Sequence, residues 1–327
     1  MTTLIHFLLI ALGFILLIKG ADFLVDGASS LAKRFHVSDI MIGLIVVAMG
    51  TSAPELVINL ISGTVMTTEG THDVVFGNII GSNIFNVFLI LGVSAMIYPL
   101  TVGKNSLLKE IPFSVVITII FFILANDVLF FNAESNQLSH YDAVILLVLF
   151  GFFIFYIFMN IKKNPSSSEI NNTKIHGNLK TALMIIGGIS GLVFGGQLIV
   201  DNAIIIARSF DVSEKLIGLT ILAAGTSLPE LATSAVAAFK KNSDLAIGNI
   251  IGSNIFNLLL VLGLTTSVHA PLGFNIEFNT DLYISMAGTA MLFIFMYTFG
   301  RYKLDRIEGF IYLVCFGLYM WFLINRQ

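Results

Sequence analysis

The sequence predicts an all-α polytopic membrane protein with ten transmembrane helices, arranged as two inverted five-helix repeats. Three observations predict this class. Of the 327 residues, 56% are hydrophobic and only 11% are charged, whereas soluble domains carry about 25% charged residues. Apolar runs long enough to cross a bilayer recur along the whole chain. Two long motifs occur twice, once in each half of the chain.

The apolar runs divide the chain into ten expected spans, several of which are longer than a bilayer requires and must therefore tilt or protrude. The most polar connection, 162–179, is expected to be a short cytoplasmic linker between a first five-helix repeat at 1–161 and a second, inverted repeat at 180–327. The chain starts without the basic region of a signal peptide, so its start is interpreted as the first span. The expected spans are 4–31, 38–66, 74–98, 107–126, 141–161, 180–208, 213–239, 244–267, 282–300 and 306–325.

Two duplicated motifs define the repeats. Gly-Thr-Ser-Ala-Pro-Glu at 50–55 returns as Gly-Thr-Ser-Leu-Pro-Glu at 225–230. Gly-Asn-Ile-Ile-Gly-Ser-Asn-Ile-Phe-Asn at 77–86 returns without a difference at 248–257. Five spans per half is an odd number, so the second half is expected to enter the membrane upside down relative to the first. Inverted repeats with broken helices near the midplane are typical of secondary transporters.

Lysine and arginine predict the orientation in the membrane. If the N-terminus is outside, most of these residues fall in inside loops, and only Arg208, Lys215 and Arg326 lie outside, with Lys19 inside a span. Because basic residues favour the inside, both termini are expected outside. The net charge of −3 and the short basic loops give no support for nucleic acid as a partner, and the single Cys315 excludes an internal disulfide.

Glu55 and Glu230 are the leading candidates for a cation site. Each lies inside an apolar run, where an ionisable residue is costly and predicts function. Pro54 is expected to interrupt the helix beside the acid, because proline lacks a backbone N–H, and the carbonyls released around 48–51 then need partners. Oxygen-rich ligation that includes carboxylates suits a hard cation. The alternative is a buried acid that only bonds to a neighbouring helix.

Hydroxyl and amide side chains repeat around these acids. Ser82 with Asn86, and Ser253 with Asn257, lie four positions apart, so each pair shares a helix face. Their oxygens are expected to complete a cation site. Alternatively, small residues and asparagines allow helices to approach closely and bond to one another. Both interpretations can hold together.

Charged residues of the first span form a third cluster. Lys19 and Asp22 are three positions apart and are able to pair, Asp26 follows, and Asp201 is the equivalent of Asp26 in the second half. A local ion pair or a position near the water interface is favoured over ion binding. The sequence contains no nucleophile elbow, phosphate loop or zinc motif, so no feature supports an enzyme.

At these residues the chain resembles the Ca2+/cation antiporter superfamily, the sodium/calcium exchanger group, and is most similar to its prokaryotic branch. The doubled motifs carry the resemblance, which covers nearly the whole chain. It implies ten helices, four central ion positions, and first and sixth spans that slide across a fixed core. The implied ligands are Glu55 and Glu230, the hydroxyls of Thr51, Ser52, Thr226 and Ser227, the side chains of Ser82, Asn86, Ser253 and Asn257, and the backbone carbonyls of Ala48 and Ala223.

The chain departs from part of the family at one position. Some members, including K+-dependent exchangers, carry aspartate where this chain has Asn257. The amide argues against a K+-coupled cycle and leaves two acids in the pocket rather than three.

The resulting hypothesis is a secondary transporter that exchanges Na+ for Ca2+ by alternating access in a prokaryotic cell (inner) membrane. A H+/Ca2+ antiporter is the nearest alternative, and a passive cation channel is the alternative from another class, although channels usually place rings of ligands around an open axis. A membrane ion sensor is disfavoured because no soluble output domain is evident. Na+, Ca2+ and the lipid bilayer are the expected partners, with H+ as the other coupling ion, no cofactor and no obligatory protein partner.

Overall fold

The computed structural model describes residues 2–66, 71–101, 103–163, 175–210, 223–298 and 302–326. Within these ranges, eight helices are long and apolar enough to cross a membrane, or nine if one bent helix pair counts as a span. The expected span at 213–239 is described only from residue 223 onward, so its beginning lies outside the described residues, as does most of the expected linker at 162–179.

The described elements follow the expected spans closely. The first half contains α1 (Thr2–Arg34), α2 (Asp39–Ile42), the π-helical η1 (Gly43–Val47), α3 (Ala48–Thr51), α4 (Ala53–Ser62), α5 (Asp73–Ile84), the π-helical η2 (Phe85–Ile90), α6 (Leu91–Ile97), α7 (Lys104–Ala125), α8 (Asp127–Phe131) and α9 (His140–Lys163). The second half contains α10 (Asn178–Ser209), α12 (Ala223–Thr226), α13 (Leu228–Phe239), α14 (Ser243–Phe256), the π-helical η4 (Asn257–Val261), α15 (Leu262–His269), α16 (Phe278–Thr298) and α17 (Arg306–Asn325).

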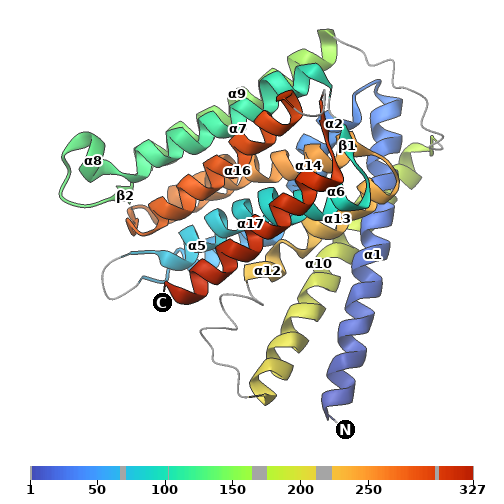
Figure 1. Cartoon of the computed structure of the whole chain (residues 1–327), viewed down its shortest axis with the longest axis horizontal. Coiled ribbons are helices and arrows are strands. Elements are labelled where there is room, and N and C mark those ends of the chain that lie inside the picture. The colour runs from blue at the N-terminus through green and yellow to red at the C-terminus, as the bar shows by residue number, and fades with distance from the viewer. Residues whose placement is uncertain are drawn as a thin grey trace.

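Two short antiparallel strand pairs, which the sequence analysis did not predict, join loops of the two halves. β1 (Leu100–Thr101) pairs with β4 (Lys303–Leu304), and β2 (Gln137–Leu138) pairs with β3 (Leu272–Gly273). β1 and β2 lie at opposite ends of the molecule in Figure 1. Each pair therefore fixes the loops at one end.

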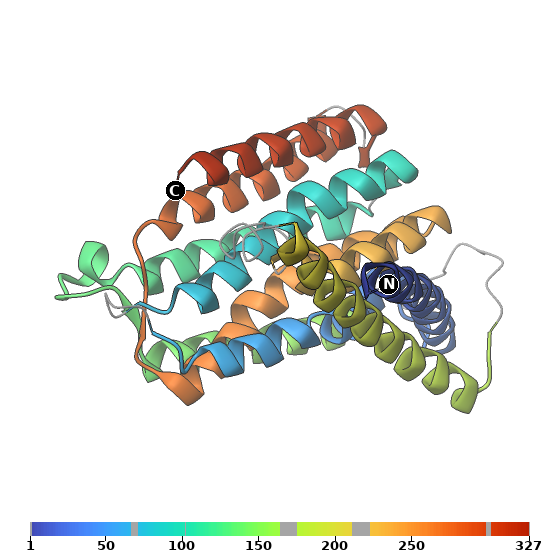
Figure 2. The same cartoon turned by 90° about the horizontal axis from the view of Figure 1, so that it is seen from below.

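Helices α1 and α10 pack along each other and run at a steep angle to the other helices (Figure 1). Figure 2 shows α1 nearly end-on, whereas the red C-terminal helix α17 lies across the view. Glycines form the seam. A Cβ on Gly20 would lie 2.8 Å from the Gly188 carbonyl oxygen, and one on Gly13 would lie 2.9 Å from that of Gly195. Gly13 meets Gly195 and Gly20 meets Gly188, so residue numbers rise along α1 as they fall along α10. These sequence-equivalent helices therefore run antiparallel, with their backbones in close contact.

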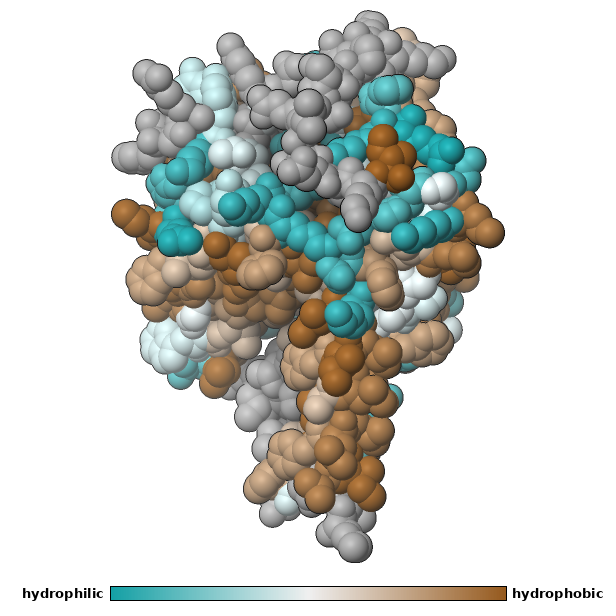
Figure 3. Space-filling view, turned by 90° about the vertical axis from the view of Figure 1, so that its right-hand side faces the viewer, coloured by the Kyte–Doolittle hydropathy of each residue, from teal (hydrophilic) through white to brown (hydrophobic). Residues whose placement is uncertain are grey.

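Burial separates central helices from peripheral ones. In the most apolar 18-residue stretch of the α14–α15 segment, 94% is buried inside the protein, whereas in the corresponding stretch of α17 only 11% is buried. The free ends of α1 and α10 form the mostly brown, apolar lower part of Figure 3, and hydrophilic residues gather above it. Large apolar side chains exposed on α1 include Phe7, Phe14 and Ile15. This distribution is expected if lipid covers the periphery and the motif helices form the core.

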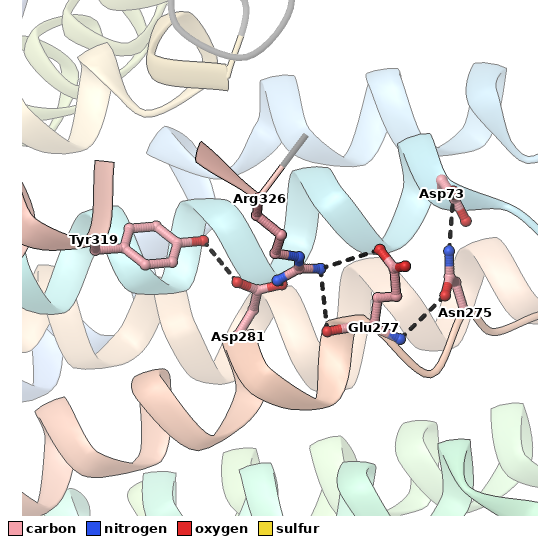
Figure 4. A network of polar contacts seen from close by, with 6 residues as sticks. All are labelled: Asp73, Asn275, Glu277, Asp281, Tyr319 and Arg326. Carbon is pink, nitrogen blue, oxygen red and sulfur yellow. Dashed lines mark hydrogen bonds and ion pairs between the residues drawn. The ribbon is translucent and has the colours of Figure 1, made fainter. Parts of the chain in front are cut away.

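A polar network ties the end of the chain to the core helices (Figure 4). Asp281, which is 3% exposed, accepts hydrogen bonds from the Tyr319 hydroxyl at 3.2 Å and from Arg326 Nη1 at 3.1 Å. Arg326 Nη2 also donates to the Glu277 carbonyl oxygen at 3.2 Å. Beside it, Asn275 donates to Asp73 at the start of α5 at 3.4 Å. The contacts hold α17, α16 and α5 together at one end.

We expect Arg326→Met to destabilise the protein by about 2 kcal/mol, because it leaves the buried Asp281 carboxylate without its cation. Thermal unfolding in detergent measures the change. Lys303→Met is the matched control, because the Lys303–Asp305 pair is about 40% exposed on both sides and such pairs contribute little. Equal losses of stability in the two variants would contradict this account of the network.

Candidate ion-binding site

Both acidic motifs lie where a helix is broken. Ser52, with φ −83° and ψ 7°, separates α3 from α4, and the two segments meet at a bend of 43°. Ser227, with φ −90° and ψ 5°, separates α12 from α13. Pro54 and Pro229 occupy the first turns of the helices that follow, where their missing N–H groups cost little. The predicted interruption beside each acid is therefore confirmed.

The two acids are buried, and each is bonded to hydroxyls. Glu55 and Glu230 are both 1% exposed. Oε1 of Glu230 accepts from Ser52 Oγ at 3.1 Å and from Ser253 Oγ at 3.4 Å. Oε1 of Glu55 accepts from Ser82 Oγ at 3.5 Å. Oε2 of each acid is buried with no hydrogen-bond partner among the described residues, so one oxygen of each carboxylate remains for another ligand.

The other expected hydroxyls gather at the same place. Thr51 Oγ1 lies 3.5 Å from Ser253 Oγ, and Ser227 Oγ donates to Ser82 Oγ at 3.1 Å. Thr226 ends α12, and Ala223 begins it. The acid of the second half and the serine of the first are in contact, so the two halves share one set of oxygens.

One expectation needs correction. The Ala48 carbonyl was predicted to be released by the helix break, but it accepts the Ser52 N–H at 2.9 Å and lies 3.3 Å from Thr51 Oγ1. This bond is the last one of α3, so the break at Ser52 begins after the Ala48 carbonyl has been satisfied. A carbonyl oxygen has a second lone pair, so Ala48 keeps the capacity to bind a cation.

Asn86 and Asn257 each use the amide nitrogen within the protein. Asn86 Nδ2 donates to Asn254 Oδ1 at 2.9 Å, and Asn257 Nδ2 donates to Asn83 Oδ1 at 3.1 Å. The Oδ1 atoms of Asn86 and Asn257 are buried without a hydrogen-bond partner among the described residues. The nitrogens therefore join helices while the oxygens remain available, which is how both interpretations of these residues hold together.

Sequence reasoning missed four asparagines of the same motif. Asn83 and Asn254 orient the amides just described, and Asn78 and Asn249 contact the threonines, with Thr226 Oγ1 donating to Asn78 Oδ1 at 3.3 Å. Their positions inside the duplicated decapeptide were the available signal. The i, i+4 rule selected only one pair in each copy, because it considers one helix face at a time.

The charged cluster of α1 is paired differently from the prediction. Lys240, at the end of α13, lies 2.6 Å from Asp22 Oδ1 and 2.7 Å from Asp26 Oδ1. The partner of Asp22 is thus a residue distant in sequence and not Lys19. The equivalent acid of the second half, Asp201, lines a cavity of about 310 Å³ that also includes Thr226, Pro54 and Pro229. The equivalent acids of α1 and α10 therefore have unlike surroundings, since Asp26 is in an ion pair and Asp201 lines a cavity.

Two buried carboxylates, surrounded by hydroxyl and amide oxygens between broken apolar helices, characterise an integral membrane protein with a candidate site for hard cations. The description "Sodium/calcium exchanger protein" belongs to the family model that matches residues 5–159 and 180–325. The chain therefore belongs to the sodium/calcium exchanger family, a family of transporters and not of enzymes, and the predicted membership of the Ca2+/cation antiporters is confirmed.

Individual relatives agree. The chain is 31% identical to the sodium/calcium exchanger MaX1 of Methanosarcina acetivorans in an alignment 358 positions long, covering 97% of each protein. It is 34% identical over 290 residues to the inner membrane protein YrbG of Escherichia coli, covering 85% of this chain and 86% of that protein. The solved structure of the sodium-calcium exchanger NCX_Mj, soaked with zero Na+ and Ca2+, matches with a TM-score of 0.80 at 31% identity, covering 98% of this chain and 99% of that one.

Proposed function

We propose that the protein is a secondary transporter that exchanges Na+ for Ca2+ by alternating access. The carrying observation is the pair of buried acids, Glu55 and Glu230, each with one oxygen that has no hydrogen-bond partner among the described residues. Carboxylate, hydroxyl and amide oxygens suit Ca2+ and Na+ better than soft transition metals. The proposed ligands are the two acids with Thr51, Ser52, Ser82, Asn86, Thr226, Ser227, Ser253 and Asn257 and the carbonyls of Ala48 and Ala223.

We further propose ten spans in two inverted repeats, 1–161 and 180–327, joined by a cytoplasmic linker at 162–179. The antiparallel course of α1 and α10 and the equivalent contacts of the duplicated motifs support this topology. Both termini would then face the outside of a prokaryotic cell membrane. Since α1 and α10 meet along a glycine seam, they are suited to slide together across the core and change which side reaches the site.

The test is Na+-gradient-driven 45Ca2+ uptake into proteoliposomes. Uptake that requires Na+ inside the vesicles supports the proposal. Uptake that follows a pH gradient and ignores Na+ would identify a H+/Ca2+ antiporter instead. Ca2+ flux that continues without any counter-ion would identify a passive channel. The amide of Asn257 gives the site no third carboxylate, so uptake is expected to proceed without K+.

Charge balance predicts that the exchange responds to voltage. Two ionised acids are balanced by one Ca2+, and three Na+ leave one positive charge in excess, so a cycle of three Na+ for one Ca2+ moves one net charge. That charge changes the driving force by about 2.3 kcal/mol per 100 mV, or roughly 50-fold in the Ca2+ gradient at equilibrium. We expect an inside-positive K+ diffusion potential to increase 45Ca2+ uptake into Na+-loaded vesicles. Uptake that ignores the potential would mean an electroneutral cycle.

A further inference from the structure

Asn249 is fully buried beside the proposed site, and its amide is held in one orientation. Its Nδ2 donates to Ser234 Oγ at 2.9 Å and to the Glu230 carbonyl oxygen at 3.4 Å, and its Oδ1 accepts from Thr51 Oγ1 at 3.1 Å. A backbone carbonyl only accepts hydrogen bonds. The amide nitrogen must therefore face Glu230, and the amide oxygen must face Thr51.

This orientation gives the Thr51 hydroxyl hydrogen its nearest acceptor. Asn249 Oδ1 lies at 3.1 Å, the Ala48 carbonyl oxygen at 3.3 Å and Ser253 Oγ at 3.5 Å. A hydroxyl has one hydrogen. When that hydrogen points to Asn249, the lone pairs of Thr51 and one lone pair of the Ala48 carbonyl can face a cation. When it points to Ala48, it competes with the cation for the carbonyl.

The other half reaches the same arrangement with different side chains. Asn78 Oδ1 accepts from Thr226 Oγ1 at 3.3 Å, and Asn78 Nδ2 donates to Asn59 Oδ1 at 2.6 Å. Asn59, in turn, donates to the Val75 carbonyl oxygen at 3.3 Å. Asn59 occupies the place that Ser234 has in the second half. In both halves an asparagine oxygen is directed to the threonine by a chain of donors that ends at a backbone carbonyl.

We propose that Asn249 and Asn78 are positioning residues that take the hydroxyl hydrogens of Thr51 and Thr226 and so turn the threonine oxygens toward the transported cation. They act through the threonines and do not bind the ion themselves. This inference rests on the proposed exchange function and names two residues that set the affinity of its site.

The test is a double-mutant cycle measured by the Ca2+ dependence of Na+-driven 45Ca2+ uptake in proteoliposomes. We expect Asn249→Leu to weaken the apparent Ca2+ affinity about 5- to 10-fold, the effect of one hydrogen bond that directs an oxygen at a charge. Thr51→Val should have a similar effect. The double variant should lose no more apparent Ca2+ affinity than the more strongly affected single variant, because Asn249 has no hydroxyl left to orient once Thr51 is replaced. Glu134→Gln is the control, since Glu134 is an exposed loop residue outside the site, and its affinity should stay within about twofold.

The inference would be overturned if the affinity loss of the double variant equalled the product of the two single losses. It would also be overturned if Asn249→Leu left the Ca2+ dependence unchanged. A purely structural role lowers the unfolding temperature equally with or without Thr51, and thermal unfolding of all four proteins reveals it. Asn78→Leu with Thr226→Val gives a second cycle with the same expected non-additivity. If the wild-type protein fails to exchange, the proposed function is wrong; if it exchanges and the losses multiply, only the positioning role is wrong.

Discussion

Glu55→Gln and Glu230→Gln should each reduce Na+-driven 45Ca2+ uptake by roughly 100-fold or more. Either change leaves a single carboxylate to balance a doubly charged ion in a site that is closed to water. An uncompensated buried charge costs about 3 kcal/mol or more, which corresponds to this loss. The effect should be similar for the two acids, because both are 1% exposed and both keep one oxygen without a protein partner among the described residues.

Glu134→Gln is the matched control for these variants. Glu134 is an exposed loop residue, so the same loss of charge should leave uptake within about twofold. Calorimetry with Ca2+ should show binding to the wild type and to Glu134→Gln but not to the two site variants. Normal exchange by Glu55→Gln would remove the central acids from the mechanism.

The second large effect is expected at the α1–α10 seam. A Cβ on Gly188 would lie 2.7 Å from the Leu24 nitrogen and 2.8 Å from the Gly20 carbonyl oxygen, and neither backbone atom can move aside alone. Gly188→Val should therefore push the two helices apart, at a cost of about 1–3 kcal/mol from overpacking. We expect a lower unfolding temperature in detergent. Uptake should fall at least tenfold, because a displaced α1–α10 pair has to recover its packed arrangement to transport, and roughly 1.4 kcal/mol of that cost corresponds to a factor of ten.

The neighbouring glycine separates this effect from a general intolerance of α10. A Cβ on Gly187 meets no atom within 4 Å. Gly187→Val therefore places the same side chain one position away, on the outer surface of the same helix. It should leave stability and uptake near the wild-type values. Similar damage from both variants would mean that the seam has no special role.

The positions of the helices could be predicted because apolar length is a local property of the sequence. The last helix, α17, begins and ends where hydropathy places it, at Arg306 and Asn325. The expected span 282–300 starts a turn later than α16, and the residues that it leaves out include the charged Asp281. In the structure the helix already begins at Phe278, and Asp281 is buried against Arg326, 45 residues further along the chain. No local window contains that partner.

The site residues were likewise predictable where the signal lay in the sequence itself, and were missed where their role depends on a partner distant in sequence. The acids inside apolar runs, their duplication and the family resemblance brought Glu55, Glu230 and their serines into one hypothesis, and in the structure each acid accepts a hydrogen bond from a serine. The partner of Asp22 was missed because Lys240 comes from another helix. Asn249 was missed because its role depends on which of its amide atoms faces Thr51, and only the positions of Ser234 and the Glu230 carbonyl determine that.

Ser52 of the first half donates to the acid of the second, and Ser227 of the second donates to Ser82 of the first. Neither half, produced alone, would hold a finished set of oxygens, so a separated fragment should ignore Ca2+ even if it inserts and folds. Mixing the two fragments in one bilayer should restore binding only when they insert in opposite senses. Ion affinity would then report on the completed assembly of the chain, as well as on the chemistry of its pocket.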